Sequence, residues 1–307
     1  MKLFATAFAV AVAAVAFVSA QVLPTNTIVG NAVAIPELST LVSIVASPGY
    51  EDVLDALNDP AANLTLFAPN NAAFDTLPAV PDYETLIAVL YYHVVPARVR
   101  SVDLGTLQFP SSLMSNASLV NIGAGQAQVL EVIKANGNVD VVFGIPGSPA
   151  YTARVTTADI ACVNGFIHIV NLVLLPPAEA SVTAVAAGLN NLAYALTVTG
   201  LLDTVDALTA ITVFAPTDAA FDAIPGWRTL PISTLTNILL YHVVPAVAYS
   251  TDLVDGQIVP TLQGQTLRIT TDGGVRVNGV DVVLANALIK NGVVHVIDEV
   301  LLPSKKW

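Results

Sequence analysis

The chain has 307 residues, of which 54% are hydrophobic and only 11% are charged, and its formal net charge is −12. A chain this apolar and this poor in charge is not intrinsically disordered, because disorder requires low hydrophobicity and high charge. Its 11 Lys and Arg residues are outnumbered by 23 acidic ones, which leaves no cationic patch for a phosphate backbone, so we expect no nucleic-acid partner.

Residues 1–20 have the pattern of a secretory signal peptide. A positive start at Lys2 is followed by an apolar run over residues 3–18 and by a small-residue pair that ends at Ala20. A transmembrane anchor is the alternative, because the run approaches the length that spans a bilayer, but the small residues favour cleavage after Ala20. We therefore expect a protein secreted to the extracellular space or the cell wall, with no transmembrane segment after cleavage. Residues 302–307 carry no apolar tail, so we also expect no GPI-anchor signal.

Residues 201–217 have the spacing of helices around one short strand. An apolar stripe within residues 201–208 has helical periodicity, and residues 212–215 have the composition of a short strand. Pro216 ends this strand, and Thr217 can cap the helix that follows. An apolar helix face also ends at each of the two Tyr-His pairs, at residues 92–93 and 241–242.

Strands joined by tight turns are expected in the later part of each repeat. Asn-Gly pairs at residues 164–165, 278–279 and 291–292 are the residues that two-residue hairpin turns favour. Helices come first and hairpin-connected strands follow. This order of elements predicts an α+β fold.

Three sequence blocks occur twice, in the same order, along the chain. They are residues 66–74 and 213–221, residues 92–96 and 241–245, and residues 164–176 and 291–303. Self-similarity of this kind is the signature of a tandem duplication. We therefore expect a first domain at residues 30–176, a short linker at 177–180 and a second domain at 181–303, followed by a tail at 304–307.

The two copies differ in length between the Tyr-His block and the closing block. The paired histidines of these blocks are 75 positions apart in the first copy and 53 apart in the second, so the first copy has 22 extra residues here. We expect this surplus in the Gly/Pro-rich stretch 144–149 and in the Ser/Asn stretch around Asn116, because both have loop composition.

Two Asn-x-Ser/Thr sequons lie in the first copy, at Asn63 and Asn116. In a secreted protein both sequons reach the compartment in which asparagine side chains are glycosylated. Both also fall in or beside segments where the first copy departs from the second. We therefore expect a glycoprotein that carries glycans at these two asparagines.

All four histidines occupy paired positions of the repeat, His93 with His242 and His168 with His295. Imidazole pairs bind zinc or copper, but no Cys, Asp or Glu at a ligand spacing completes either pair, so we expect no metal site. At the end of an apolar helix face, His93 and His242 can hydrogen-bond the last free carbonyl groups of the helix. This position predicts that both side chains turn inward.

No set of residues in the sequence assembles a catalytic site. Cys162 stands where the second copy has Ile289, so we expect a small buried apolar residue and not a nucleophile. As the only cysteine, it also excludes an intramolecular disulfide. The nucleophile elbow of hydrolases, the zinc-protease helix motif and the P-loop are absent from the sequence. We therefore expect neither enzymatic activity nor a cofactor.

The three repeated blocks resemble the motifs of the fasciclin-1 (FAS1) domain, and the resemblance covers residues 30–303. The composition and the signal peptide resemble those of a secreted fungal member of this family. The resemblance implies, for each copy, a helical layer packed on a twisted wedge of about seven strands, and a role in cell–cell or cell–matrix adhesion. In animal relatives the Tyr-His block is implicated in integrin binding, which implies binding residues at Tyr92, His93, Tyr241 and His242.

These observations favour a non-catalytic adhesion, matrix or cell-wall module that binds extracellular proteins or cell-wall polysaccharides. A carrier of small apolar ligands is the alternative, because the aliphatic content is high and a cleft between helices and sheet would suit such a ligand. An accessory protein for polymer degradation is a third hypothesis, based only on the expected extracellular location.

Overall fold

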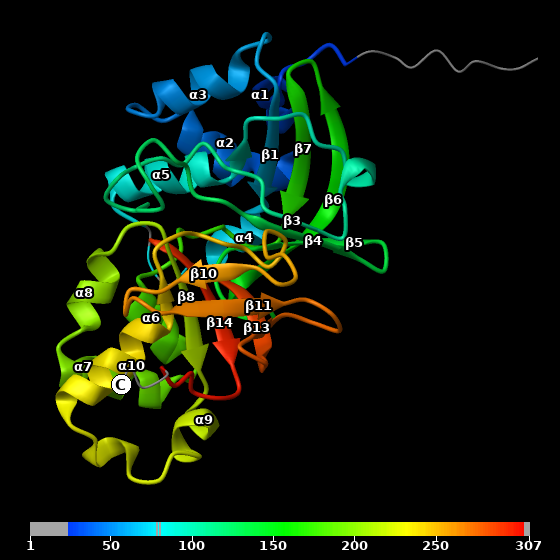
Figure 1. The fold of residues 1–307 in the computed structure, drawn as a ribbon. Coiled ribbons are helices and arrows are strands. Elements are labelled where there is room, and N and C mark those ends of the chain that lie inside the picture. The colour runs from blue at the N-terminus through cyan, green and yellow to red at the C-terminus, as the bar shows by residue number, and fades with distance from the viewer. Residues whose placement is uncertain (1–23, 78, 80, 304–307) are drawn as a thin grey trace, which may run out of the picture.

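The computed structural model describes residues 24–77, 79 and 81–303. The expected signal peptide at residues 1–20 and the tail at 304–307 lie outside these residues. Figure 1 shows the described chain as two lobes, one for each copy of the repeat. Within this part of the chain, no helix has the length and apolar character needed to cross a membrane.

Each copy begins with short α-helices that pack against its sheet. In the first copy these are α1 (Ile28–Val33), α2 (Ser39–Val45), α3 (Glu51–Asn58), α4 (Asn71–Asp75) and α5 (Tyr83–Tyr92), with 3-10 turns at Pro36–Leu38, Ser101–Asp103 and Pro149–Tyr151. In the second copy they are α6 (Ala180–Ala186), α7 (Asn190–Thr199), α8 (Leu202–Ala207), α9 (Asp218–Asp222) and α10 (Ile232–Tyr241), with a 3-10 turn at Trp227–Thr229. The Thr217 hydroxyl accepts the Ala220 amide hydrogen at 3.1 Å, which confirms the predicted cap of α9.

The strands of each copy form one seven-stranded sheet. The first sheet contains β1 (Leu64–Pro69), β2 (Val94–Val95), β3 (Leu107–Gln108), β4 (Glu131–Ala135), β5 (Asn138–Val142), β6 (Thr152–Cys162) and β7 (Gly165–Val170). The second sheet contains β8 (Ile211–Pro216), β9 (Val243–Val244), β10 (Ile258–Pro260), β11 (Thr266–Thr270), β12 (Arg276–Val277), β13 (Val280–Ile289) and β14 (Gly292–Ile297).

The two sheets have the same topology. Their orders are β2-β1-β7-β6-β5-β4-β3 and, read from the equivalent edge, β9-β8-β14-β13-β12-β11-β10. In both, the first long strand pairs in parallel with the last one, as β1 with β7 and β8 with β14, while the remaining pairs are antiparallel. The duplication and the α+β class predicted from the sequence are therefore confirmed.

The predicted Asn-Gly turns are right at one place and shifted by one residue at two others. Asn278 and Gly279 form the turn between β12 and β13, with φ of 53° and 89°. Between β6 and β7, however, Cys162 pairs with Gly165, so the turn residues are 163 and 164 and the glycine is already in the strand. The second copy shows the same shift before β14. The glycine is needed in each copy because the neighbouring parallel strand, β1 beside Gly165 and β8 beside Gly292, passes too close for a side chain.

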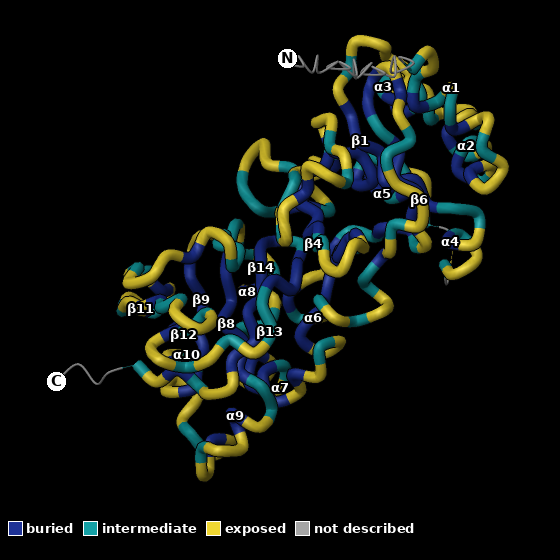
Figure 2. Tube along the Cα trace, turned by 90° about the vertical axis from the view of Figure 1, so that its right-hand side faces the viewer, coloured by how far each residue is buried: buried dark blue, intermediate teal, exposed yellow. Residues whose placement is uncertain are grey.

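Each lobe has its own hydrophobic core around the parallel strand pair. Figure 2 shows buried residues following β1, β8 and β14 through the lobes, with exposed residues in the outer loops. Every residue of these three strands is buried, because helices cover one face of the sheet and the meander strands and loops cover the other. Cys162 lies in the core of the first copy, as predicted, and its thiol accepts a hydrogen bond from Asn31 at 3.2 Å.

The two copies are joined by the segments in which the first copy is longer. The connection from β3 to β4 spans residues 109–130, against 261–265 in the second copy, and the connection from β5 to β6 spans 143–151, against 278–279. Both longer connections contact the second lobe. The Leu288 amide donates to the Gly144 carbonyl at 2.9 Å.

Asn121 and Gln128, both in the longer β3–β4 connection, provide further bonds across this interface. The Asn121 amide donates to the Lys290 carbonyl at 2.8 Å, and its side chain donates to the Leu208 carbonyl at 3.0 Å. The Gln128 side chain donates to the Ile289 carbonyl at 3.1 Å. The surplus residues therefore act as an interdomain contact and not as free loops.

Candidate functional site

The Tyr-His block, which the resemblance implies as a binding site, lies inside both lobes. Tyr92 is fully buried and Tyr241 is 5% exposed. Their hydroxyl groups donate to backbone carbonyls at the start of equivalent strands. Tyr92 donates to Val129, just before β4, at 2.8 Å, and Tyr241 donates to Thr266, the first residue of β11, at 3.0 Å. Each tyrosine thus ties the end of a long helix to the sheet.

His93 and His242 tie the same helix ends to the closing block of each copy. His93 Nδ1 donates to the Val89 carbonyl of α5 at 2.7 Å, and its Nε2 accepts the Leu174 amide hydrogen at 2.8 Å. His242 makes the equivalent bonds to the Ile238 carbonyl and the Leu301 amide. Burial lowers the pKa of both rings to about 4, so both are neutral near pH 7. The inward orientation and the helix carbonyl bond follow the prediction, whereas the amide partner was not foreseen.

The second histidine pair is also satisfied by the backbone. His168 Nδ1 accepts the Asp159 amide hydrogen at 3.1 Å and its Nε2 bonds the Val99 carbonyl at 2.9 Å, and His295 has the equivalent partners. Among the described residues, no group of three His, Cys, Asp or Glu side chains could hold a metal ion.

None of the four Tyr-His side chains is exposed by more than 5%. In this conformation they cannot contact a partner, and the aliphatic residues beside them in the sequence, such as Leu90 and Val243, are buried as well. Direct binding by these four residues stays an untested prediction.

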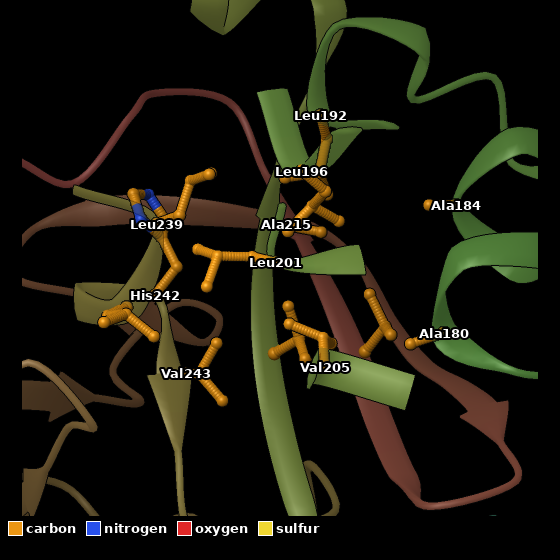
Figure 3. A pocket seen from close by; sticks show the side chains of 13 residues that line it. Ala180, Ala184, Leu192, Leu196, Leu201, Val205, Ala215, Leu239, His242 and Val243 are labelled. Carbon is orange, nitrogen blue, oxygen red and sulfur yellow. The ribbon is translucent and has the colours of Figure 1, made fainter. Parts of the chain in front are cut away.

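An apolar pocket lies in the second lobe, between its helices and the parallel strand pair. Figure 3 shows its side chains converging from α6, α7 and the strands, with His242 at one side. Its volume is only about 30 Å³, roughly the space of one or two water molecules. Both ring nitrogens of His242 already have partners, so the pocket offers no polar group there. A lipid-sized ligand does not fit this cavity.

The two copies differ at the start of their first helices, on one side of this pocket. Ile28 begins α1, whereas the smaller Ala180 begins α6 and lines the pocket. The Ile28 amide also donates to the Asn164 side chain at 2.9 Å. The equivalent oxygen of Asn291 has no hydrogen-bond partner in the described structure. This opening is a packing difference between the copies.

A larger cleft, with a volume of about 650 Å³, lies between the two lobes. The longer β3–β4 connection of the first copy forms one wall, and residues around Tyr249 of the second copy form the other. The rings of Phe109 and Tyr249 stack across it with centroids 4.4 Å apart. The lining residues are Phe109, Ser111, Ile122, Gln126, Ala127, Val129, Ala210, Val247, Tyr249, Thr251 and Asp252. We call this hollow the interdomain cleft.

The sequence analysis missed the interdomain cleft because its walls come from different copies. No local motif marks it, since each wall contributes ordinary loop residues. The only signal was the unequal spacing of the paired histidines, which showed that the first copy has extra residues in this region. A cleft with aromatic faces and several polar side chains is a typical binding surface.

Both predicted glycosylation sites are exposed in the first lobe. Asn116 Oδ1 accepts hydrogen bonds from the Ser118 amide at 2.9 Å and from the Ser118 hydroxyl at 2.6 Å, and Asn63 precedes β1 in a loop. After expression in a glycosylating eukaryotic host, we expect Asn63→Gln and Asn116→Gln each to remove one glycan mass. Intact-mass spectrometry before and after glycosidase treatment measures this, and unchanged masses would contradict it.

Comparison with known proteins identifies the same domain in two segments of the chain. The sequence profile of the Fasciclin domain matches residues 36–176 and 187–303. These two segments contain the two seven-stranded sheets and most of the helices.

Individual relatives carry the same domain. The Fasciclin-like arabinogalactan protein of Arthroderma benhamiae is 29% identical over 88% of this chain, and the match covers 65% of that protein, which is less than two thirds. Periostin of Homo sapiens is 26% identical over 78% of this chain and 28% of its own length. Among solved structures, the FAS1 domain pair from the insect cell adhesion molecule Fasciclin I is 19% identical, with a TM-score of 0.42, over 87% of this chain and 97% of that chain.

Proposed function

This chain belongs to the fasciclin domain family as a tandem pair, and we propose that it is a secreted adhesion or cell-wall module that binds without catalysing a reaction. The relatives named as fasciclin-like arabinogalactan protein and periostin support an extracellular role. The predicted signal peptide and sequons support the same location. We propose that its partners are cell-wall polysaccharides or extracellular proteins.

The observation that carries this proposal is the interdomain cleft. It is lined by both copies, so it exists only in the tandem pair, and it is large enough for several sugar rings or a short peptide segment. The stacked rings of Phe109 and Tyr249 give it an aromatic lining, and Gln126 and Thr251 offer hydrogen-bonding groups at its edge. The net charge of −12 disfavours a polyanion. We therefore favour a neutral polysaccharide over an acidic one.

The apolar-ligand alternative has one further hollow to consider, a mainly apolar pocket of about 210 Å³ at the junction of the two copies, lined by residues such as Phe143, Leu175 and Leu288, but this volume is below that of typical ligand pockets, about 300 Å³ or more. The 30 Å³ pocket of the second lobe is smaller still. An accessory role in polymer degradation rests on location alone.

The test is retention of the purified, glycosylated protein by insoluble cell-wall fractions. We expect saturable retention, and we expect Tyr249→Ala to weaken it about fivefold or more, because truncating an aromatic side chain at the centre of a binding surface costs about 1 kcal/mol or more of binding free energy. Co-sedimentation over a range of protein concentrations measures the apparent Kd.

Tyr194→Ala is the matched control, because Tyr194 is 45% exposed and packs edge-on against Trp227 of the second lobe, outside the cleft. It should keep the wild-type Kd. Gln126→Ala trims an exposed side chain in the cleft wall. Weaker retention of this variant would therefore reflect a lost contact with the partner and not a loss of packing between the two copies. Equal retention of the Tyr249 and Tyr194 variants would show that the cleft is not the binding surface.

A further inference from the structure

Glu131 is a buried carboxyl group at the interface between the two copies. It begins β4 in the first copy and is only 2% exposed. Its Oε1 accepts a hydrogen bond from Asn286 Nδ2 of β13 at 3.2 Å, and its Oε2 has no partner in the described structure. A carboxylate held in this way has lost most of its hydration and regains only one hydrogen bond.

The internal repeat shows that the second copy is adapted to this carboxyl. Asn286 corresponds to Asp159 of the first copy. Both have a positive φ, of 67° and 63°, and both donate their amide hydrogen to a histidine ring and accept one from a serine amide. Asp159 bonds only within its own copy. At the position that faces Glu131, the residue is an asparagine, whose Nδ2 can donate. An aspartate there would face a second carboxylate.

Comparison of the two copies also shows that contact between the lobes buries Glu131. Leu130 and Leu267 are equivalent core residues of the two meanders, both fully buried. The next residue is Glu131 in the first copy and Arg268 in the second. Arg268 lies on a strand face with no neighbouring lobe and is exposed. The same strand position thus points to solvent in one copy and into the interface in the other, so separating the lobes would return Glu131 to water.

No charged side chain in the described part of the chain forms an ion pair or a hydrogen bond with Glu131. Burial raises its pKa to about 7, and the hydrogen bond from Asn286 lowers it by a smaller amount. The titratable or charged groups on the elements packed around it are Lys134 on β4, Asp140 on β5, Asp281 on β13, His295 on β14, and Tyr249 and Asp252 in the loop before β10. Asp140 and Asp281 are paired with Arg154 and Arg276, and Lys134 donates to the Ser101 carbonyl.

We propose that Glu131 is a proton-controlled latch, which holds the two copies together while its carboxyl is protonated and loosens them when it ionises. The docked form has a pKa of about 7 and the separated form the ordinary value of 4.5. The stabilisation of the docked state is therefore complete below about pH 4.5 and is lost as the pH rises through about 7. The latch does not depend on what the interdomain cleft binds.

Hydrogen exchange at amides that cross the interface tests the latch in the full chain. The amides of Asn121 and Leu288 donate to Lys290 and Gly144 of the opposite copy, so they exchange when the lobes separate. Between pH 5.5 and pH 8, we expect their protection, corrected for the intrinsic exchange rate, to fall about thirtyfold in the wild type, which is the change that the two pKa values give. In Glu131→Gln, which is neutral at every pH, the protection should stay constant.

Glu37→Gln is the matched control, because Glu37 is exposed on a 3-10 turn of the first lobe, and this variant should keep the wild-type profile. An equal fall in protection in Glu131→Gln, or no fall in the wild type, would overturn the proposal. A carboxyl-carbon NMR titration of Glu131 in the wild-type chain needs no variant to fold. A midpoint near 7 supports the latch, and a midpoint near 4.5 refutes it.

Discussion

Replacing Gly165 or Gly292 with alanine should prevent the affected copy from forming its sheet. A Cβ at Gly165 would lie 1.8 Å from the Leu64 carbonyl oxygen, and a Cβ at Gly292 would lie 1.8 Å from that of Ile211. Both obstacles are backbone atoms of the neighbouring parallel strand, which cannot move aside without breaking the central pairing. We expect a loss of about 4 kcal/mol or more of unfolding free energy, seen as loss of soluble protein or an early urea transition.

Gly105→Ala provides the comparison for these two variants. A Cβ there would meet only the flexible Gln108 side chain, at 3.4 Å, so its urea midpoint should stay within the range of ordinary surface changes, about 0.5 kcal/mol. If Gly165→Ala unfolded at the wild-type urea concentration, the pairing of β1 with β7 described here would be wrong.

Replacing His93 or His242 with alanine should destabilise the fold without removing a binding group. In each copy, the change leaves one helix carbonyl and one amide of the closing block without a partner in the core. Each unpaired buried group costs about 1–3 kcal/mol, so together with the cavity we expect a loss of about 3–5 kcal/mol per variant. Urea unfolding at pH 7 measures this loss.

The same histidines predict how the stability of the wild type depends on pH. Burial lowers their pKa to about 4 in the folded chain, below the ordinary value of 6.5. Their contribution is therefore complete above about pH 6.5 and is lost as the pH falls through about 4, by about 3 kcal/mol for each ring. Glu131 makes stability depend on pH in the opposite direction, but its effect is measured separately, by hydrogen exchange at the amides of Asn121 and Leu288. A His93→Ala chain that kept its stability but lost cell-wall retention would contradict the structural role.

Much of the fold could be predicted because the repeat is visible in the sequence. Three blocks in the same order fixed two equivalent copies, and the apolar spacing gave the helices and the central strand. The turns at residues 164–165 and 291–292 were wrong by one position. Their glycines are required by a strand that is distant in sequence, Leu64 for Gly165 and Ile211 for Gly292, and no local pattern reveals such a contact.

The site was less predictable, because its contacts join residues far apart in the chain. Gln128 and Ile289, for example, are 161 positions apart, and Glu131 has the sequence context of an ordinary strand residue. Two signals were nevertheless present. The histidine spacings revealed the surplus of the first copy, and aligning the repeats places Asn286 opposite Asp159, an exchange of a carboxylate for an amide at an otherwise equivalent position.

The most direct test of the proposed function is a footprint of the bound partner on the full chain. Hydrogen–deuterium exchange, measured with and without a soluble fragment of the cell-wall polymer that retains the protein, locates the contact surface. We predict protection within residues 109–129 and 247–252, the two walls of the interdomain cleft, and none at the Tyr-His pairs beyond their existing burial. Protection confined to other surfaces, with both cleft walls unchanged, would contradict the account.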